Sequence, residues 1–236
     1  MSSLLKIENL GKTFVLHRFA KSIQGCAGIS LTLQGGQFIG ITGKSGAGKS
    51  TILKCIYRTY IPTAGRIVFQ SAQYGLIDLA QAAEREIIYL RKQEIGYVSQ
   101  FLMVLPRVTA LEMVTESIIE TGLPPESARH EAKQILHHLQ ISQNLWDAYP
   151  NNFSGGEKLR LNLAQAMVKR PRLLLLDEPT ASLDHQAKEL VKKMIMQLKK
   201  QGTSMLGIFH DTDFMKNVID DEFVMNQGIM HKSGVA

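Results

Sequence analysis

The beginning of the chain alternates hydrophobic and polar positions, as strands with one buried face do. The alternation runs through 4–16 (LLKIENLGKTFVL) and returns twice within 29–43 (ISLTLQGGQFIGITG), where Gly35 and Gly36 separate two strands. A further strand-like run is 65–70 (GRIVFQ). The sequence therefore predicts a sheet that begins close to its N-terminus.

Helical spacing of apolar residues follows these strands. The stretches that show it are 49–60, 79–92 and 109–140. Between the last two lies a short predicted strand, 94–100 (EIGYVSQ). Pro124 and Pro125 interrupt the longest stretch, so we expect one helix to end there and a second to begin at Glu126.

The second half of the chain alternates helix and strand. Its expected elements are a helix from Gly155, a buried strand 172–177 (RLLLLD), a helix 185–200, a strand 204–210 (SMLGIFH) and a last helix–strand unit. Such alternation on both sides of a helical stretch favours an α/β fold with a mostly parallel sheet covered by helices. We expect one domain over 1–236, with a core formed by 1–100 and 155–236 and an inserted helical subdomain over 101–154.

Length and composition agree with a folded α/β domain. The chain has 236 residues, of which 44% are hydrophobic and 20% charged, which is typical of globular proteins. The apolar block near its middle, 173–176, is far shorter than the ~20 residues that cross a bilayer. The N-terminus lacks the apolar run and cleavage site of a secretory signal. A cytoplasmic location is expected.

Charge and cysteine content leave the function open. A net charge of +6 and a pI of 9.3 would suit an anionic ligand, a nucleic acid or an acidic protein surface. The lysines of 185–200, however, fit the solvated face of an amphipathic helix. Cys26 and Cys55 lack a CxxC spacing, so packed thiols are expected rather than a disulfide or a metal site.

The segment 43–51 (GKSGAGKST) matches the GxxxxGKS pattern of a phosphate-binding loop. It follows a predicted strand and precedes a predicted helix, as that loop requires. Its residues are Gly43, Lys44, Ser45, Gly46, Ala47, Gly48, Lys49, Ser50 and Thr51. Glycine lets backbone amides surround phosphate oxygens, Lys49 would reach the β and γ phosphates, and the Ser50 hydroxyl could ligate Mg²⁺. A chance lysine after a glycine turn is the alternative.

Two adjacent carboxylates, Asp177 and Glu178, end the buried strand in LLLLDEP. Ligands of such folds collect at the carboxyl ends of parallel strands, so both should lie near the phosphates. Asp177 would hold Mg²⁺ through its water shell, and Glu178 could act as general base for the attacking water. Alone, adjacent acids are also common as solvated turn residues.

The segment 153–157 (FSGGE), which we call the signature turn, is a second glycine-rich stretch at a predicted helix start. Ser154 and Glu157 are spaced as a capping box, which explains both residues structurally. It does not explain why Gly155 and Gly156, poor helix formers, occupy the first turn. The cap and a phosphate-binding role are compatible.

Taken together these motifs resemble the ATP-binding-cassette (ABC) ATPases over nearly the whole chain. The phosphate loop, Gln100, FSGGE, LLLLDEP, ASLD and His210 follow the order and approximate spacing of that family. The resemblance implies a RecA-like P-loop NTPase core with a parallel sheet, an additional antiparallel β region and an inserted helical subdomain. It also implies ATP and Mg²⁺ as cofactors and ATP hydrolysis as the activity.

The resemblance assigns further roles to single residues. Phe14 would stack on adenine, Gln100 would contact Mg²⁺ and the partner side, Asp184 would lie at a dimer seam, and His210 would hold the γ phosphate. On their own, a strand-end histidine or glutamine is more commonly structural. Ser154, Gly155, Gly156 and Glu157 of one copy would close over ATP bound to the loop of another, giving an ATP-dependent homodimer with two nucleotides.

This sequence departs from the common family pattern at two positions near the signature turn. Glu157 replaces the usual glutamine, and Gln165 stands where a basic residue is usual in the following helix. The second change puts helix packing and coupling between subunits in question.

Several runs resemble one subfamily, the PhnL-type ATP-binding component of the bacterial phosphonate carbon–phosphorus (C–P) lyase system. They are YRTYIPTAGRI, REIIYLRKQEIGYVSQFLMVLPRVTALEMV, LLLLDEPTASLD and GIFHD; Met103, where that component usually has a basic residue, does not match. The resemblance implies assembly or remodelling of the lyase complex beside a second ABC ATPase. A partner would dock on 101–112, whose apolar residues alternatively pack the insertion onto the core.

The alternative is the ATP-binding subunit of an exporter of the lipoprotein-release or macrolide-export type. Its membrane subunits would be encoded separately, and the chain would then be peripheral at the inner membrane. A DNA-repair or ribosome-associated role is disfavoured because no long coiled coil or second cassette is present, and no direct nucleic-acid partner is expected.

Overall fold

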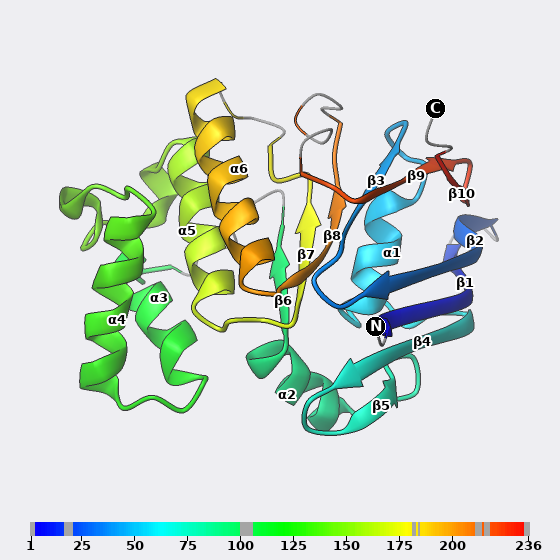
Figure 1. Cartoon of the computed structure of the whole chain (residues 1–236), viewed down its shortest axis with the longest axis horizontal. Coiled ribbons are helices and arrows are strands. Elements are labelled where there is room, and N and C mark those ends of the chain that lie inside the picture. The colour runs from blue at the N-terminus through cyan, green and yellow to red at the C-terminus, as the bar shows by residue number, and fades with distance from the viewer. Residues whose placement is uncertain are drawn as a thin grey trace.

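The computed structural model describes residues 3–16, 21–99, 106–180, 183, 185–210, 214 and 218–233. Its centre is a six-stranded sheet in the order β10-β9-β3-β8-β7-β6 (Figure 1). These strands are β3 (Phe38–Gly43), β6 (Ile95–Val98), β7 (Leu173–Asp177), β8 (Ser204–Ile208), β9 (Asp221–Asn226) and β10 (Ile229–Lys232). All neighbouring pairs are parallel except β9 with β10. The mostly parallel sheet is therefore confirmed.

A second, antiparallel sheet has the order β2-β1-β4-β5. Its strands are β1 (Ser3–Leu16), β2 (Lys21–Gln34), β4 (Ala64–Ser71) and β5 (Gly75–Asp78). The helices are α1 (Lys49–Ile56), α2 (Glu84–Gln93), α3 (Ala110–Ile119), α4 (Pro125–His138), α5 (Gly155–Met167) and α6 (His185–Lys200). Two short 3₁₀ turns, η2 (Gln143–Leu145) and η3 (Pro150–Asn152), connect α4 to α5. The antiparallel region and the helical insertion that the family resemblance implies are therefore both present.

The six-stranded sheet separates two hydrophobic cores. Leu173 and Leu175 point into the core shared with α1 and the antiparallel sheet, whereas Leu174 and Leu176 point into the core shared with α3 to α6. Successive side chains of a strand face opposite sides, so a strand buried on both faces is apolar at every position. This explains why the run LLLL lacks alternation.

The helical insertion packs on α5, the helix that follows it. Helices α3 and α4 contact each other and α5, and all three share one core (Figure 1). The boundaries 101–154 for this subdomain stay a prediction. Within the described residues, no helix is both long and apolar enough to cross a membrane.

Three of the predicted helices begin or end at other residues than expected. The helix expected over 79–92 begins only at Glu84, because Asp78 accepts the Ala80 amide and holds 79–81 as a turn. The helix expected over 49–60 ends at Ile56, and Arg58 has a positive φ of 65°. The helix expected from Glu126 begins at Pro125, whose missing amide proton costs nothing in a first turn.

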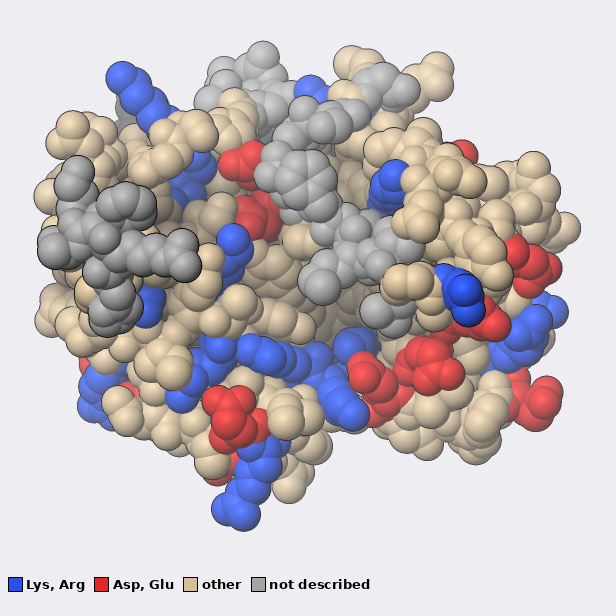
Figure 2. All heavy atoms as spheres, turned by 180° about the vertical axis from the view of Figure 1, so that it is seen from behind, with Lys and Arg blue, Asp and Glu red and all other residues tan. Residues whose placement is uncertain are grey.

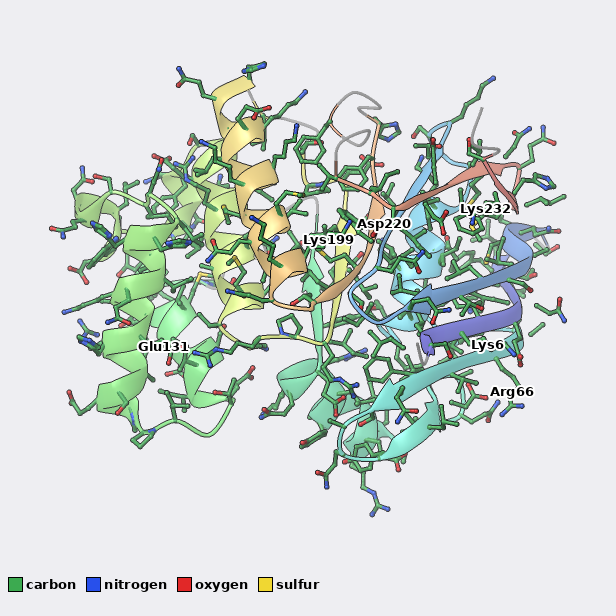
Figure 3. All side chains as sticks on the ribbon, viewed as in Figure 1. Lys6, Arg66, Glu131, Lys199, Asp220 and Lys232 are labelled. Atoms are coloured by element: carbon green, nitrogen blue, oxygen red, sulfur yellow. The ribbon has the colours of Figure 1, made fainter. Side chains whose placement is uncertain are left out.

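Polar contacts also fix the ends of the elements. Lys199 at the end of α6 lies 2.6 Å from an Asp220 carboxylate oxygen (Figure 3), and the other oxygen accepts the Phe38 amide at 2.8 Å. The start of β3, the strand that leads to the phosphate loop, is thereby tied to α6.

Seen from behind, lysine and arginine side chains form a band across the middle of the molecule next to a group of acidic ones (Figure 2).

Candidate functional site

The phosphate loop connects β3 to α1 at the carboxyl end of the parallel sheet. Gly48 has a φ of +97°, and a Cβ there would lie 1.8 Å from the Gly25 carbonyl oxygen. Gly43 has a φ of +136°, and its Cβ would lie 2.1 Å from the Met225 carbonyl oxygen. At both positions only glycine fits the backbone and the space. The chain itself therefore requires these two glycines.

The turn between β9 and β10 braces this loop from the C-terminal side. The Gly228 amide donates to the Ala47 carbonyl at 3.1 Å, and the Gly228 carbonyl accepts the Ala27 amide at 2.9 Å. The loop is thus held between β2 and the last hairpin. Nothing in the sequence pattern predicted this contact, because it joins positions far apart in the chain.

Lys49, the first residue of α1, is buried against the loop, with 4% of its surface exposed. Its ammonium donates to the carbonyl oxygens of Gly43 at 2.7 Å and Lys44 at 3.0 Å. Burial lowers the Lys49 pKa, while the nearby Glu178 and Asp177 carboxylates oppose that shift. The structure thus places a buried cation at the loop where the phosphates are expected.

Asp177 is held by a donor on each of its carboxylate oxygens. The Ser50 hydroxyl donates to Oδ1 at 2.8 Å, and the Tyr97 hydroxyl donates to Oδ2 at 2.7 Å. A hydroxyl and a carboxylate side by side are the hard oxygen donors that Mg²⁺ prefers, together with phosphate oxygens and water. Among the described residues no group of three or more His, Cys, Asp or Glu could hold a metal. Ser50 and Asp177 fit a Mg²⁺ that shares its coordination with a nucleotide.

Tyr97 was missed by the sequence analysis. It lies on β6 opposite Leu175 of β7, and side chains two apart share a face, so Tyr97 and Asp177 lie on the same side of the sheet. Burial and the Asp177 charge raise the pKa of Tyr97 well above its ordinary value. No sequence signal could have found it, since the contact depends on the pairing of β6 with β7.

Glu178 and His210, predicted from separate segments, contact each other. His210 Nε2 lies 2.8 Å from Glu178 Oε1. Glu178 has a φ of +53°, a conformation that costs a residue with a side chain energy and that recurs at functional sites. Its amide donates to the Ile208 carbonyl at 3.1 Å, which holds it beside the end of β8. Asp177 and Glu178 therefore face different partners although they are adjacent.

The signature turn forms the predicted capping box at the start of α5. The Ser154 amide and hydroxyl each donate to Glu157 Oε2 at 2.7 Å, and Ser154 Oγ accepts the Glu157 amide at 3.3 Å. These bonds lower the Glu157 pKa. A Cβ on Gly156 would find no atom nearer than Arg160 Nη1 at 3.6 Å, an ordinary contact. The chain therefore does not itself require glycine at 156.

Phe14 lies on β1 near the start of α1. Its ring meets Tyr60 edge-on with centroids 5.1 Å apart, and a Cβ on Gly25 would lie 2.8 Å from Phe14 Cε2 and 3.0 Å from Thr51 Cγ2. An aromatic ring beside the phosphate loop is where the family resemblance expects adenine. Gln100 and Asp184 lie outside the described residues, so their predicted roles stay predictions.

The unusual Gln165 links α5 to α3. Its amide nitrogen lies 3.4 Å from both the Met113 carbonyl oxygen and Ser117 Oγ. One turn earlier, Asn162 donates to the Ser99 carbonyl at 3.0 Å. The helix behind the signature turn is therefore attached to the insertion and to β6 by amide groups, without a basic residue at 165.

Comparison with known proteins gives matches over nearly the whole chain. Residues 26–181 match the family model described as ABC transporter. LolD of Aquifex aeolicus (strain VF5), a lipoprotein-releasing system ATP-binding protein, is 32% identical over 90% of each chain. The cell division ATP-binding protein FtsE of Bacillus subtilis (strain 168) is 30% identical over 92% of each chain. The dimeric ATP-binding cassette MJ0796, solved with ADP and Pi, superposes with a TM-score of 0.87 at 26% identity, covering 98% of this chain and 99% of that one.

Proposed function

Because the chain belongs to the ABC transporter family, we propose that it works as a head-to-tail dimer in which the phosphate loop of one copy and the signature turn of another enclose each ATP. As a member of this family it is an ATPase with Mg-ATP as its substrate. The dimeric state of the cassette MJ0796 supports the assembly.

Room for a side chain at Gly156 is the observation that carries the proposal. A glycine in a helix costs about 1 kcal/mol relative to alanine. At Gly48 the chain itself forbids any side chain, but at Gly156 it does not. A glycine with no internal reason is explained by something outside the chain that approaches its backbone closely, and a nucleotide held by a second copy is such a group.

The elements that carry the two turns support a site shared between two copies. The phosphate loop follows β3, whereas α5 packs against β6, and β8 and β7 lie between these strands. The loop and the signature turn therefore begin helices that follow or cover strands which are not neighbours in the sheet. In a two-fold dimer the phosphate loop of each copy meets the signature turn of the other, so two equivalent sites form.

Within each site we assign roles from the contacts. Lys49 and the loop amides bind the β and γ phosphates, Ser50 and Asp177 hold Mg²⁺, and Glu178 accepts the proton of the attacking water. His210 orients Glu178 and reaches the γ phosphate. When bound, Mg²⁺ neutralises charge on the phosphates. Phe14 supports the adenine.

A cross-linking experiment tests the arrangement in trans. The variant Ser45→Cys/Ser154→Cys carries one thiol on the phosphate loop and one on the signature turn, while native Cys26 and Cys55 are buried. With ATP, Mg²⁺ and the added change Glu178→Gln, we expect disulfide-linked dimers under oxidation. Ser154→Cys alone, as the matched control, should remain unlinked. Absence of ATP-dependent linkage, with monomers throughout by light scattering, would refute the dimer.

For the physiological partner we propose the PhnL-like role in the C–P lyase system. Its support is the set of runs that resemble that component, which covers the segment before and after Gln100, the stretch after α1, and GIFHD. ATP hydrolysis would then drive assembly or remodelling of lyase subunits beside a second ABC ATPase. The segment 101–112, of which 101–105 lie outside the described residues, would be the docking surface.

An exporter subunit is the second candidate, favoured by the similarity to LolD. Co-purification of the tagged chain from cells grown on a phosphonate as the phosphorus source separates the two. Lyase subunits retained without detergent support the first role, and a detergent-extracted membrane protein supports the second. A change at an exposed, described position of 101–112, such as Arg107→Glu, should weaken capture of the true partner and leave basal ATPase activity unchanged.

A further inference from the structure

Two donors from different elements fix the Asp177 carboxylate. Ser50 on α1 holds Oδ1, and Tyr97 on β6 holds Oδ2. The last torsion of an aspartate side chain is broad, so a carboxylate without such contacts samples many orientations. With a donor on each oxygen, Asp177 has one orientation, and it is 7% exposed.

The Tyr97 ring is itself fixed by packing against a neighbouring ring. It packs against Tyr57 with ring centroids 4.9 Å apart, and the Arg91 guanidinium lies 4.7 Å from the Tyr57 ring centroid. Arg91 also donates to the Tyr57 carbonyl at 2.9 Å. This stack joins the end of α1, α2 and β6, so the Tyr97 hydroxyl is presented to Asp177 from a rigid support.

The Ser50 and Tyr97 hydroxyls would have different roles when Mg²⁺ is bound. Ser50 is itself a metal ligand in the proposed function, so its hydroxyl is shared between Asp177 and the metal. Tyr97 lies on the other carboxylate oxygen and can keep its bond in both states. Partners of this kind, which orient a metal ligand without touching the metal, contribute strongly to metal affinity.

We propose that Tyr97 is a positioning residue for magnesium: its hydroxyl orients Asp177 so that the opposite carboxylate oxygen serves the metal beside Ser50. The inference rests on the proposed Mg-ATP function and adds to it a residue to which the sequence analysis assigns no role. Removal of one oxygen atom, in Tyr97→Phe, should weaken metal binding and leave the packing of the ring unchanged.

The test uses Mn²⁺ as a paramagnetic probe and ADP as the nucleotide, on the full chain. Electron paramagnetic resonance measures Mn²⁺ bound to the ADP-saturated protein, and a fluorescent ADP analogue measures nucleotide affinity in EDTA. For Tyr97→Phe we expect Mn²⁺ affinity to fall about tenfold, the usual effect of losing an outer partner of a metal ligand. Nucleotide affinity in EDTA should stay within about twofold, because Tyr97 has no phosphate contact in this scheme.

Tyr57→Phe is the matched control, since it removes a hydroxyl from the neighbouring ring of the same stack. Its Mn²⁺ affinity should equal that of the wild type. Equal loss by both variants, an equal loss in EDTA, or no loss in Tyr97→Phe would each overturn the inference. If the wild-type protein fails to retain Mn²⁺ with ADP, the proposed function falls and the inference with it. That result differs from a normal wild type with an unaffected variant.

Discussion

The phosphate loop and the signature turn are both glycine-rich starts of helices, yet the chain treats their glycines differently. In the loop, Gly43 and Gly48 have positive φ and backbone carbonyls within 2.1 Å and 1.8 Å of a would-be Cβ. In the signature turn, Gly156 has its nearest neighbour at 3.6 Å. The first set is required by the fold of one copy. Gly156 has no such requirement inside the copy.

This difference distinguishes an internal from an external reason for glycine. An internal reason shows as a clash or a positive φ in the single chain. An external reason leaves space in the single chain and becomes apparent only when another molecule approaches. An alanine at Gly48 should therefore strain the single chain, whereas an alanine at Gly156 should be tolerated by the single chain and affect only the contact with another molecule.

The largest effect is expected at the phosphate loop. Gly48→Ala meets the Gly25 carbonyl and a φ that costs a side chain about 1–2 kcal/mol. We expect nucleotide affinity to fall at least about 100-fold, by calorimetric titration with ATP. Gly46→Ala is the matched control, because its φ is also positive but no atom lies within 4 Å, so its loss should be clearly smaller. Equal losses would mean that the close approach at Gly48 is unimportant.

Glu178→Gln should reduce ATP turnover about 100-fold or more, because it removes the general base. ATP binding should be unaffected, since Lys49 and the loop remain. Phosphate release assays and ATP titration measure the two effects. Because this variant should retain ATP, it also provides the state in which contact between the signature turn of one copy and the ATP of another can be observed. Turnover equal to that of the wild type would refute the role of Glu178.

Gly156→Ala should separate stability from activity. The free chain has space for the methyl group, so its unfolding free energy should rise by about 0.5–1 kcal/mol in urea. Turnover should nevertheless fall about tenfold or more, because the added group displaces the turn from the other copy's nucleotide. A stable variant with normal turnover would leave Gly156 without an external role.

Ser154→Ala removes the hydroxyl of the capping box. Loss of such a cap costs about 1 kcal/mol of stability. Urea unfolding of the variant and the wild type measures it, with Thr109→Ala, which caps α3 in the same way, as the matched control. A variant as stable as the wild type would show that the hydroxyl serves only the nucleotide.

The smallest expected effect is a pH dependence of the stability difference between the wild type and Ser154→Ala. The bonds from Ser154 lower the Glu157 pKa below its ordinary 4.5, so the folded state prefers the ionised form. This contribution is complete above 4.5 and is lost as pH falls through the lowered folded-state pKa. The stability difference between wild type and Ser154→Ala should therefore shrink on acidification below that value. A difference that is constant with pH would contradict it.

The parts of the candidate site that could be predicted are those whose residues belong to one contiguous sequence motif. Phosphate loop, adjacent acids and signature turn are contiguous motifs, and the structure places Ser50 beside Asp177 and His210 beside Glu178. The contacts of Tyr97 and of Gly228 were not predictable, since each joins segments whose adjacency depends on strand order. The stretch 79–83, which precedes the helix, was predicted as helical because its buried apolar residues have helical spacing by coincidence.

The sequence by itself determined the alternating elements, the residues able to bind phosphate and Mg²⁺, and the capping of α5, because each depends on neighbours a few positions away. Only the tertiary structure decided which strand lies beside which, and hence that Tyr97 meets Asp177 and that the phosphate loop follows β3 whereas α5, which the signature turn begins, packs against β6. Strand order is set by burial summed over both faces of the sheet, and no single segment contains that information.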